Sequence, residues 1–359
     1  MFVKSFGAVV CIFATSVVSQ TYTDCNPTEK TCDPAPALGN LTIDCDFTQG
    51  ACSDFTAATG TTITYDDNGA LFSIENDTQA PTLSTSRYIF FGRVEVQLKA
   101  AVGQGIITSV VLQSADLDEI DWEWFGGKDT EVESNYFGKG DTTTYDREEY
   151  HDVTTPLSTY HTYTIEWTSS KVEWLIDNVV VRTLNYADAE SGTRFPQTPM
   201  QLKIGTWAGG LSTNSEGTIE WAGGVTDFSE APFQAWYKSV SVVDYAGGNS
   251  SATESITEYV YSDTSGSYES ITVVKGESVS EEDLTVNNST SLVTTAGGSS
   301  ASNGTIVSNS TSSSSTSTTT AQATSGTSTV PTTTSNDAAS SSVSTLFAIC
   351  AAAIMISAL

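Results

Sequence analysis

The stretch Glu119-Ile120-Asp121-Trp122-Glu123-Trp124 decides the fold class, because its acidic and apolar side chains alternate with a period of two. In a β-strand, residues two and four positions apart share one face. The acids Glu119, Asp121 and Glu123 are therefore expected on one face, and the isoleucine and both tryptophans on the other. The apolar face suits the core between two packed sheets.

The same alternation recurs on both sides of this stretch. Residues 93–99, 163–167 and 233–240 follow it, and Asp177-Asn178 separates two further runs as the turn of a hairpin. Helical periodicity is nearly missing from this part of the sequence. Many short strands joined by turns predict an all-β domain, a jelly-roll sandwich of two antiparallel sheets.

Three carboxylates on one strand face repel each other, so folding by itself does not favour them. One interpretation is an ordinary acidic surface facing solvent. The other is a retaining glycosidase, which needs an ionised carboxylate as nucleophile and a protonated carboxyl as acid and then base. Crowding of the acids raises the pKa of one member, which keeps the acid protonated. The close spacing of the acids and the tryptophans behind them favour the enzyme.

Several motifs match known proteins. Glu119-Ile120-Asp121-Trp122-Glu123 resembles the signature of glycoside hydrolase family 16. Residues 134–140, 204–210 and 217–224 narrow the resemblance to fungal cell-wall transglycosylases of the Congo-red-hypersensitive (Crh) family. The resemblance covers roughly residues 25–245.

The resemblance implies a jelly roll with a concave substrate cleft. It implies that Glu119 is the nucleophile, Asp121 its helper and Glu123 the acid/base. The substrates it implies are a chitin donor and a β-glucan or chitin acceptor, with no cofactor. Two alternatives stay open, an endo-β-glucan hydrolase and a non-catalytic polysaccharide-binding cell-wall glycoprotein.

A second alternating strand supplies candidate substrate contacts. Residues 200–207 place Lys203 and Trp207 on the face opposite the core, where they can reach a sugar; an exposed lysine beside a rim tryptophan is the plainer interpretation. The family resemblance supports both residues and Thr218 as chitin contacts. Tyr136 and Phe137 are further candidates for stacking on sugar rings, although either could belong to the core.

The cysteines indicate an oxidising compartment. Four lie in the expected domain and allow three pairings, of which two local loops, Cys25 with Cys32 and Cys45 with Cys52, are the simplest. Zinc is the competing interpretation, but the gaps are longer than usual for thiolate pairs and no histidine is near. We expect no metal, and structural roles for His151 and His161.

Both ends of the sequence resemble processing signals. Residues 1–19 resemble a secretory signal peptide, with a retained anchor as the alternative. Small residues at 336–338, a Ser/Thr spacer and an apolar tail over 346–359 follow one another, which is typical of a glycosylphosphatidylinositol (GPI) signal. Asn336 is the expected attachment residue, and residues 337–359 are the expected propeptide; a tail-anchored helix is the alternative. The catalytic domain is expected over 20–245, and a disordered, Ser/Thr-rich glycosylated stalk over 246–336. The protein would then reside on the outer face of the cell membrane and in the cell wall.

Charge excludes one class of partner. The formal net charge is −29, with only 14 Lys and Arg in 359 residues. Nucleic-acid binding needs clustered cations, whereas a neutral polysaccharide tolerates this charge. We expect a monomer that carries N-linked glycans. The sequons are at Asn40, Asn76, Asn249, Asn287, Asn288, Asn303 and Asn309.

Overall fold

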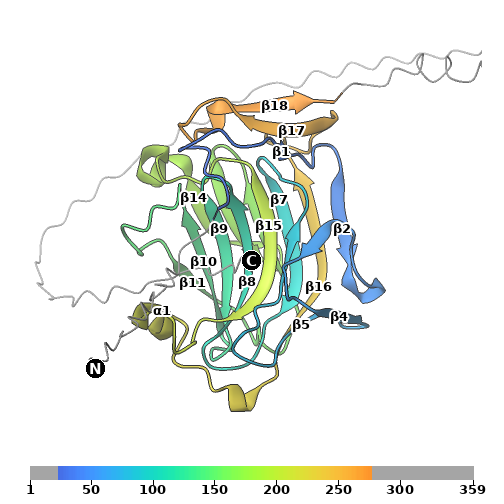
Figure 1. Ribbon diagram of the computed structural model, residues 1–359, viewed down its shortest axis with the longest axis vertical. Coiled ribbons are helices and arrows are strands. Elements are labelled where there is room, and N and C mark those ends of the chain that lie inside the picture. Colours follow the sequence, from blue (N-terminus) through green and yellow to red (C-terminus); the bar gives the residue numbers. More distant parts are fainter. Residues whose placement is uncertain (1–22, 277–359) are drawn as a thin grey trace, which may run out of the picture. The chain divides into compact units, whose positions relative to one another are not determined.

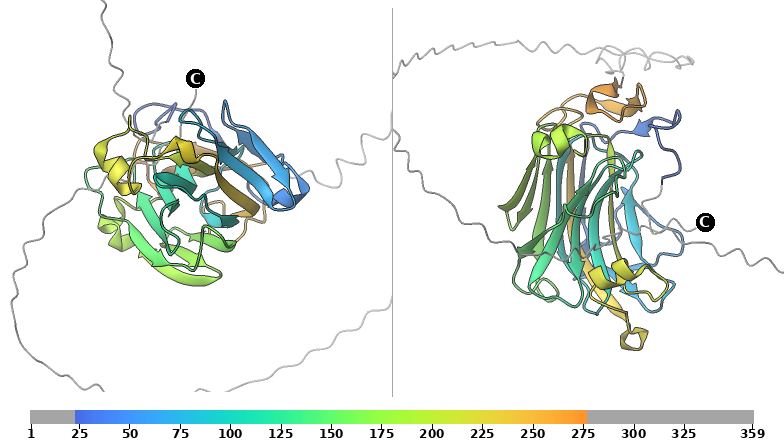
Figure 2. Two further views of the ribbon diagram at one scale, coloured as in Figure 1. Left: turned by 90° about the horizontal axis from the view of Figure 1, so that it is seen from below. Right: turned by 90° about the vertical axis from the view of Figure 1, so that its left-hand side faces the viewer.

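The computed structural model describes residues 23–276, which form an antiparallel β-sandwich (Figures 1 and 2). Its all-β class and two antiparallel sheets confirm the predicted jelly roll. One sheet has the strand order β11 (Glu149–Asp152), β10 (Glu131–Phe137), β9 (Glu119–Phe125), β8 (Ile106–Ser114), β15 (Met200–Ala208), β6 (Thr82–Thr85), β3 (Phe55–Ala57). This sheet carries Glu119, Asp121 and Glu123, and we call it the acidic sheet.

The second sheet packs behind the first, as the right-hand view of Figure 2 shows. Its order is β14 (Val179–Asn185), β13 (Lys171–Ile176), β12 (His161–Trp167), β7 (Gly92–Lys99), β16 (Phe233–Asp244), β5 (Gly69–Ile74), β4 (Ile63–Asp66), and β2 (Thr42–Asp46) also pairs with β16. Along β7, buried and half-buried residues alternate, as expected for a strand with one face on the core.

Helices are short in the described part. They are α1 (Glu216–Trp221) and 3-10 turns at Phe47–Gln49, Tyr186–Asp188, Glu190–Gly192, Phe228–Glu230 and Tyr268–Ser270. No helix within residues 23–276 is long and apolar enough to cross a membrane. The expected signal peptide, most of the stalk, the GPI signal with Asn336, and the four sequons from Asn287 onward lie outside the described residues.

Aromatic side chains from both sheets fix the strand that bears the acids. All seven residues of β9 are buried. Trp122 and Trp124 pack edge-on against Tyr163 of β12, with ring centroids 5.6 and 4.4 Å apart. Trp174 of β13 donates from Nε1 to the main-chain oxygen of Asp121 at 3.1 Å. The tryptophans therefore pack behind the strand that bears the acids, as the alternation predicted.

Folded structure continues beyond residue 245, where the domain was expected to end. β17 (Ile256–Tyr261) pairs with β18 (Ile271–Lys275) and with β1 (Ala35–Pro36) in a small third sheet. The fully buried Tyr259 donates its hydroxyl to Asp244, whose carboxylate also accepts main-chain N–H groups of Gly39 and Phe90. These contacts attach the third sheet to the sandwich, so residues 246–276 belong to the fold and not to the stalk.

Both local disulfides are present. Cys25 is bonded to Cys32 and Cys45 to Cys52, each with a Cα–Cα distance of 5.8 Å. Cys45, Cys52 and Asp54 lie close enough together to resemble a metal site. The disulfide removes two of its three ligands, because only a thiolate binds a metal.

Candidate active site

Cross-strand register aligns the three acids with neighbours on the same face of the acidic sheet. Glu119 lies opposite Gln113 of β8 and Phe137 of β10, and Asp121 lies between Val111 and Asn135. Glu123 lies between Ser109 and Glu133. The acids share the face turned away from the tryptophan core, as predicted, and each is at most 2% exposed.

A hydrogen-bonded chain connects Glu119 to a cation. Lys203 Nζ donates to Gln113 Oε1 at 2.6 Å, and Gln113 Nε2 donates to Glu119 Oε2 at 2.7 Å. Burial raises the pKa of Glu119, while Asp121, Gln113 and the charge of Lys203 act to lower it. Lys203 therefore lies on the predicted face, but its contact with Glu119 runs through Gln113, which the sequence did not single out.

Asp121 lies between two like charges. Burial, then the charges of Glu119 and Glu123, raise its pKa well above the usual value. A carboxyl that keeps its proton can donate to a neighbouring carboxylate. Asp121 is therefore suited to orient an ionised Glu119, which is the role of helper implied for it.

The surroundings of Glu123 are the opposite of those of Glu119. Its Oε1 has no hydrogen-bond partner among residues 23–276. Burial, then the charges of Glu133 and Glu119, raise its pKa well above the usual value. One carboxyl is thus placed to be an anion and the other to hold a proton, which is the asymmetry that a retaining glycosidase needs.

Glu133 is a fourth buried acid that the sequence analysis missed. Its Oε2 accepts from Trp221 Nε1 at 2.9 Å, and its Oε1 accepts from Asn135 Nδ2 at 3.2 Å. Burial raises its pKa to about 7, and these donors partly oppose the change. The alternation of residues 131–137 could have placed Glu133 and Asn135 on one face. Their pairing with the acids depends on a register that the sequence does not display.

Aromatic residues form a wall beyond Glu123. Trp207 stacks on Trp221 with centroids 5.9 Å apart, and Trp221 packs edge-on against Phe125 at 5.2 Å. Trp207 is only 5% exposed, so it is packed within this wall and does not stand open. Thr218 lies in the first turn of α1, fully buried, with its hydroxyl 2.8 Å from that of the capping Ser215. Its predicted contact with chitin gains no support from this position.

The two aromatic candidates on β10 differ. Tyr136 lies opposite Ile120 and belongs to the main hydrophobic core, so its role as a sugar platform is not supported. Alternation alone assigns it to the core face, opposite to Phe137. Phe137 lies opposite Glu119 on the acid face, but the guanidinium of Arg147 covers its ring at 4.7 Å.

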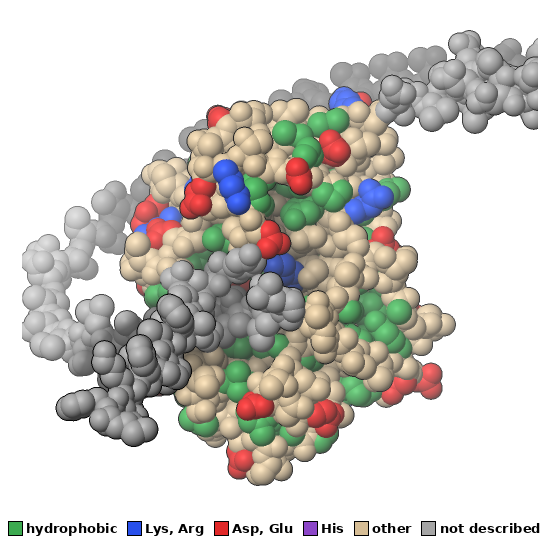
Figure 3. All heavy atoms as spheres, in the orientation of Figure 1, with side chains coloured by type: hydrophobic (Ala, Val, Ile, Leu, Met, Phe, Trp, Pro, Cys, Tyr) green, Lys and Arg blue, Asp and Glu red, His purple; other side chains and the backbone are tan. Residues whose placement is uncertain are grey.

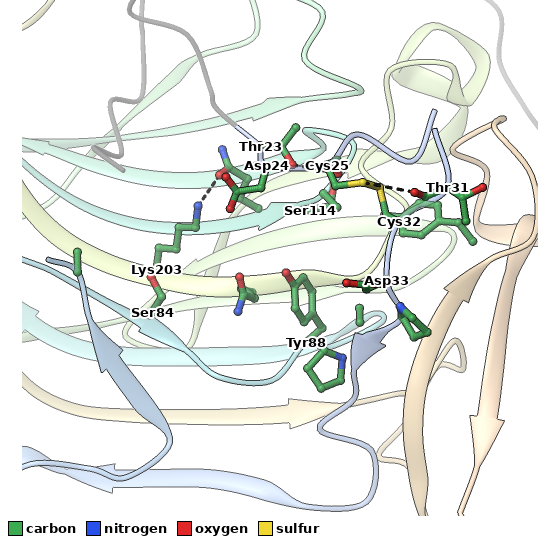
Figure 4. Close-up of a pocket in the computed structure, with 18 of the residues that line it drawn as sticks. Thr23, Asp24, Cys25, Thr31, Cys32, Asp33, Ser84, Tyr88, Ser114 and Lys203 are labelled. Carbon is green, nitrogen blue, oxygen red and sulfur yellow. Dashed lines mark hydrogen bonds between the residues drawn. A yellow bond between two sulfur atoms is a disulfide. The ribbon is translucent and has the colours of Figure 1, made fainter. Parts of the chain in front are cut away.

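A polar cavity of about 550 Å³ extends from the Glu119 side of the site. Figure 4 shows Lys203 at one end and the Cys25–Cys32 disulfide at the other. Its volume lies within the range of about 300–1,000 Å³ that is usual for ligand sites. Its lining is rich in hydroxyl, amide and carboxylate groups. Those polar residues include Thr23, Asp24, Thr31, Asp33, Ser84, Tyr88, Gln113, Ser114 and Gln201.

The Lys203 chain makes a testable prediction. Lys203→Met removes the cation that favours ionised Glu119, so the pKa of Glu119 rises. The acid limb of the kcat/KM profile should then move to higher pH, with a loss of about threefold to tenfold on that limb. Steady-state rates against pH measure the effect, and Lys238→Met on the other sheet is the control. A uniform loss at every pH would show that Lys203 acts on binding alone.

Comparisons of the sequence and the structure with known proteins point to a single protein family. A model of glycosyl hydrolases family 16 matches residues 51–223. The chain is 49% identical to Crh-like protein 5 of Aspergillus fumigatus over 271 residues, which cover 76% of this chain and 67% of that protein. It is 48% identical to Crh-like protein 1 of the same fungus over 283 residues, covering 79% and 74%.

A solved structure is similar as well. The structure titled Crh5 transglycosylase in complex with NAG has 50% sequence identity and a TM-score of 0.65. The match covers 69% of this chain and 99% of that one. The region matched by the family model includes the three acids, Glu133 and Lys203.

Proposed function

The chain belongs to glycoside hydrolase family 16 and to its Crh-like proteins, and from this premise we propose that it is a retaining cell-wall transglycosylase. It cleaves chitin and transfers the released chain onto β-glucan or another chitin chain, which cross-links the fungal wall. The observation that carries the proposal is the unequal setting of two acids on one strand. Glu119 is connected to Lys203 through Gln113, whereas Glu123 lies beside Glu133.

In the first step, a carboxylate oxygen of Glu119 attacks the anomeric carbon of the donor. The glycosidic bond breaks, and its electron pair goes to the leaving oxygen, which takes the proton of Glu123. A covalent glycosyl-enzyme results. The Asp121 carboxyl donates to Glu119 and orients it for attack.

In the second step, a hydroxyl of the acceptor sugar attacks the same carbon. Its proton passes to Glu123, and the bond to Glu119 breaks. Hydrolysis differs only in that water takes the place of the acceptor. Transfer therefore requires an acceptor held near Glu123, where the wall of Trp207, Trp221 and Phe125 lies.

The molecular surface suits an uncharged polymer. In Figure 3 the visible face of the described residues is mostly uncharged, and hydrophobic, acidic and basic side chains are scattered over it. The cavity beside Lys203 offers hydroxyl and amide groups, which are the usual partners of sugar hydroxyls. Neither feature offers the clustered cations that phosphate binding needs.

Product analysis tests the proposal against its alternatives. The purified protein is incubated with a chitin oligomer, with and without a labelled β-glucan oligomer, and products are identified by mass spectrometry. Hybrid chains longer than either substrate are expected. Shortened chains alone would establish the hydrolase, and unchanged substrates in both reactions would favour the binding protein.

Processing and location complete the proposal. Cleavage of residues 1–19, a glycosylated stalk and GPI attachment at Asn336 would place the enzyme at the outer membrane face and in the wall. Asn40, Asn76 and Asn249 are exposed, as glycan attachment requires.

A further inference from the structure

One buried carboxyl near the reacting acids is not used in these two steps. Glu133 lies on β10 directly opposite Glu123 and is fully buried. Side chains paired in this way have Cβ atoms about 4.5–5.5 Å apart. Two carboxyls at this spacing cannot both ionise without mutual repulsion.

The surroundings decide which of the two ionises first. Glu133 accepts hydrogen bonds from Trp221 and Asn135, at 2.9 and 3.2 Å. Donors of this kind stabilise an anion. Glu123 has an oxygen without any donor among the described residues. The first negative charge of the pair therefore falls on Glu133.

We propose that Glu133 is a positioning residue that keeps the proton on Glu123. Its charge makes ionisation of Glu123 costly, so Glu123 stays able to protonate the leaving oxygen over a wider range of pH. In the second step, the same charge favours return of the acceptor's proton to Glu123. This inference rests on the proposed function. It adds Glu133 to Glu119, which forms the covalent bond, and to Glu123, which transfers the proton.

Other charged groups near Glu123 and Glu133 also change the pKa values of these two acids. On β9, the charge of Glu119 raises the pKa of Glu123 as Glu133 does. Glu148, in the segment before β11, raises the pKa of Glu133. From β15, Lys203 is directed to Glu119 through Gln113. Helix α1 contributes Trp221, which is uncharged and donates to Glu133. Of the two anions that raise the pKa of Glu123, Glu119 lies on β9 with it and Glu133 lies on β10.

The experiment compares two variants that separate charge from packing. Glu133→Gln keeps the size of the side chain but loses its charge, while Glu133→Asp keeps the charge. Glu131→Gln is the matched control, because Glu131 lies on the same strand and face but pairs with Lys128 near solvent. For each protein, kcat/KM for a chitin oligomer is measured across pH, together with thermal unfolding.

The expected result is a shift of the alkaline limb to lower pH in Glu133→Gln only. On that limb its rate should fall at least about threefold against the unmodified protein, while rates at acidic pH stay similar. An unchanged limb in Glu133→Gln would overturn the inference. So would equal shifts in both Glu133 variants accompanied by equal losses of stability, which would indicate packing.

A second measurement needs no variant at all. In the unmodified protein with carbon-13 in its glutamate carboxyls, nuclear magnetic resonance follows each ionisation. Glu133 should lose its proton at lower pH than Glu123, and the reverse order would overturn the inference. If the unmodified enzyme neither cleaves nor transfers chitin, the proposed function fails instead, and the two failures are distinguishable.

Discussion

Replacing Glu119 with glutamine is expected to lower both transfer and hydrolysis by at least about 10³-fold, as loss of an enzymatic nucleophile does. The neutral amide of glutamine is a much weaker nucleophile than a carboxylate, so formation of the glycosyl-enzyme should be almost abolished. The variant should still fold, because glutamine keeps the shape of the side chain and can still hydrogen-bond Gln113. Substrate should still bind, because the cavity beside Lys203 is unchanged.

Initial rates with chitin oligomers, with and without a glucan acceptor, measure this loss. Glu173→Gln serves as control, since Glu173 lies on the opposite sheet in an ion pair with Lys171. Thermal unfolding of both variants shows whether the fold is intact. Rates for Glu119→Gln close to those of the control would refute its assignment as nucleophile.

Replacing Glu123 with alanine is expected to lower the rate with natural chitin by about 10²–10⁴-fold, the usual contribution of a general acid and base. The loss should depend on the leaving group. When the donor is a glycosyl fluoride, the fluoride ion departs without needing a proton. With that donor, the first step stays fast and only the second is slow. Added azide, which needs no base, should then restore turnover.

The configuration of the azide product distinguishes the two acids. Azide attacking a glycosyl-enzyme gives a product with the donor's original β-configuration, since two inversions occur. A further variant, Glu119→Ala, leaves space where the carboxylate was. Azide in that space attacks the donor directly, and the single inversion gives the α-product. Identical products from both variants would show that the two roles have been wrongly divided.

Much of the site was predictable from alternation. The spacing of Glu119, Asp121 and Glu123 placed them on one face, and the tryptophans between them required a covered core. Lys203 and Trp207 were assigned to the acid face by the same rule. The prediction holds because the period of a strand is a local property of the chain.

Register between strands was not predictable. Gln113 of β8 acts on Glu119, and Glu133 of β10 acts on Glu123, because each lies opposite its partner in the sheet. That pairing depends on turn geometry and on packing across the sheet. Individual residues such as Glu133 in a polar strand therefore gave no signal of their own.

The prediction that the domain ends at residue 245 was wrong for a related reason. Residues after 245 are rich in Ser and Gly, which suggested an unfolded stalk. A few apolar residues suffice there because Tyr259 is bound by the buried Asp244 and packs edge-on against Phe90, at 5.6 Å between centroids. Composition averages over a segment, whereas this contact depends on single residues.

The central claim is that Glu119 carries the glycosyl group between donor and acceptor. The most direct test uses Glu123→Ala with a chitin-oligomer fluoride, followed by proteolysis and mass spectrometry of the peptide that contains residues 119–123. We expect a covalent adduct of one donor chain on Glu119, which disappears when acceptor and azide are added. An adduct on Asp121 or Glu133, or an inverted product formed with no adduct on the enzyme, would contradict it.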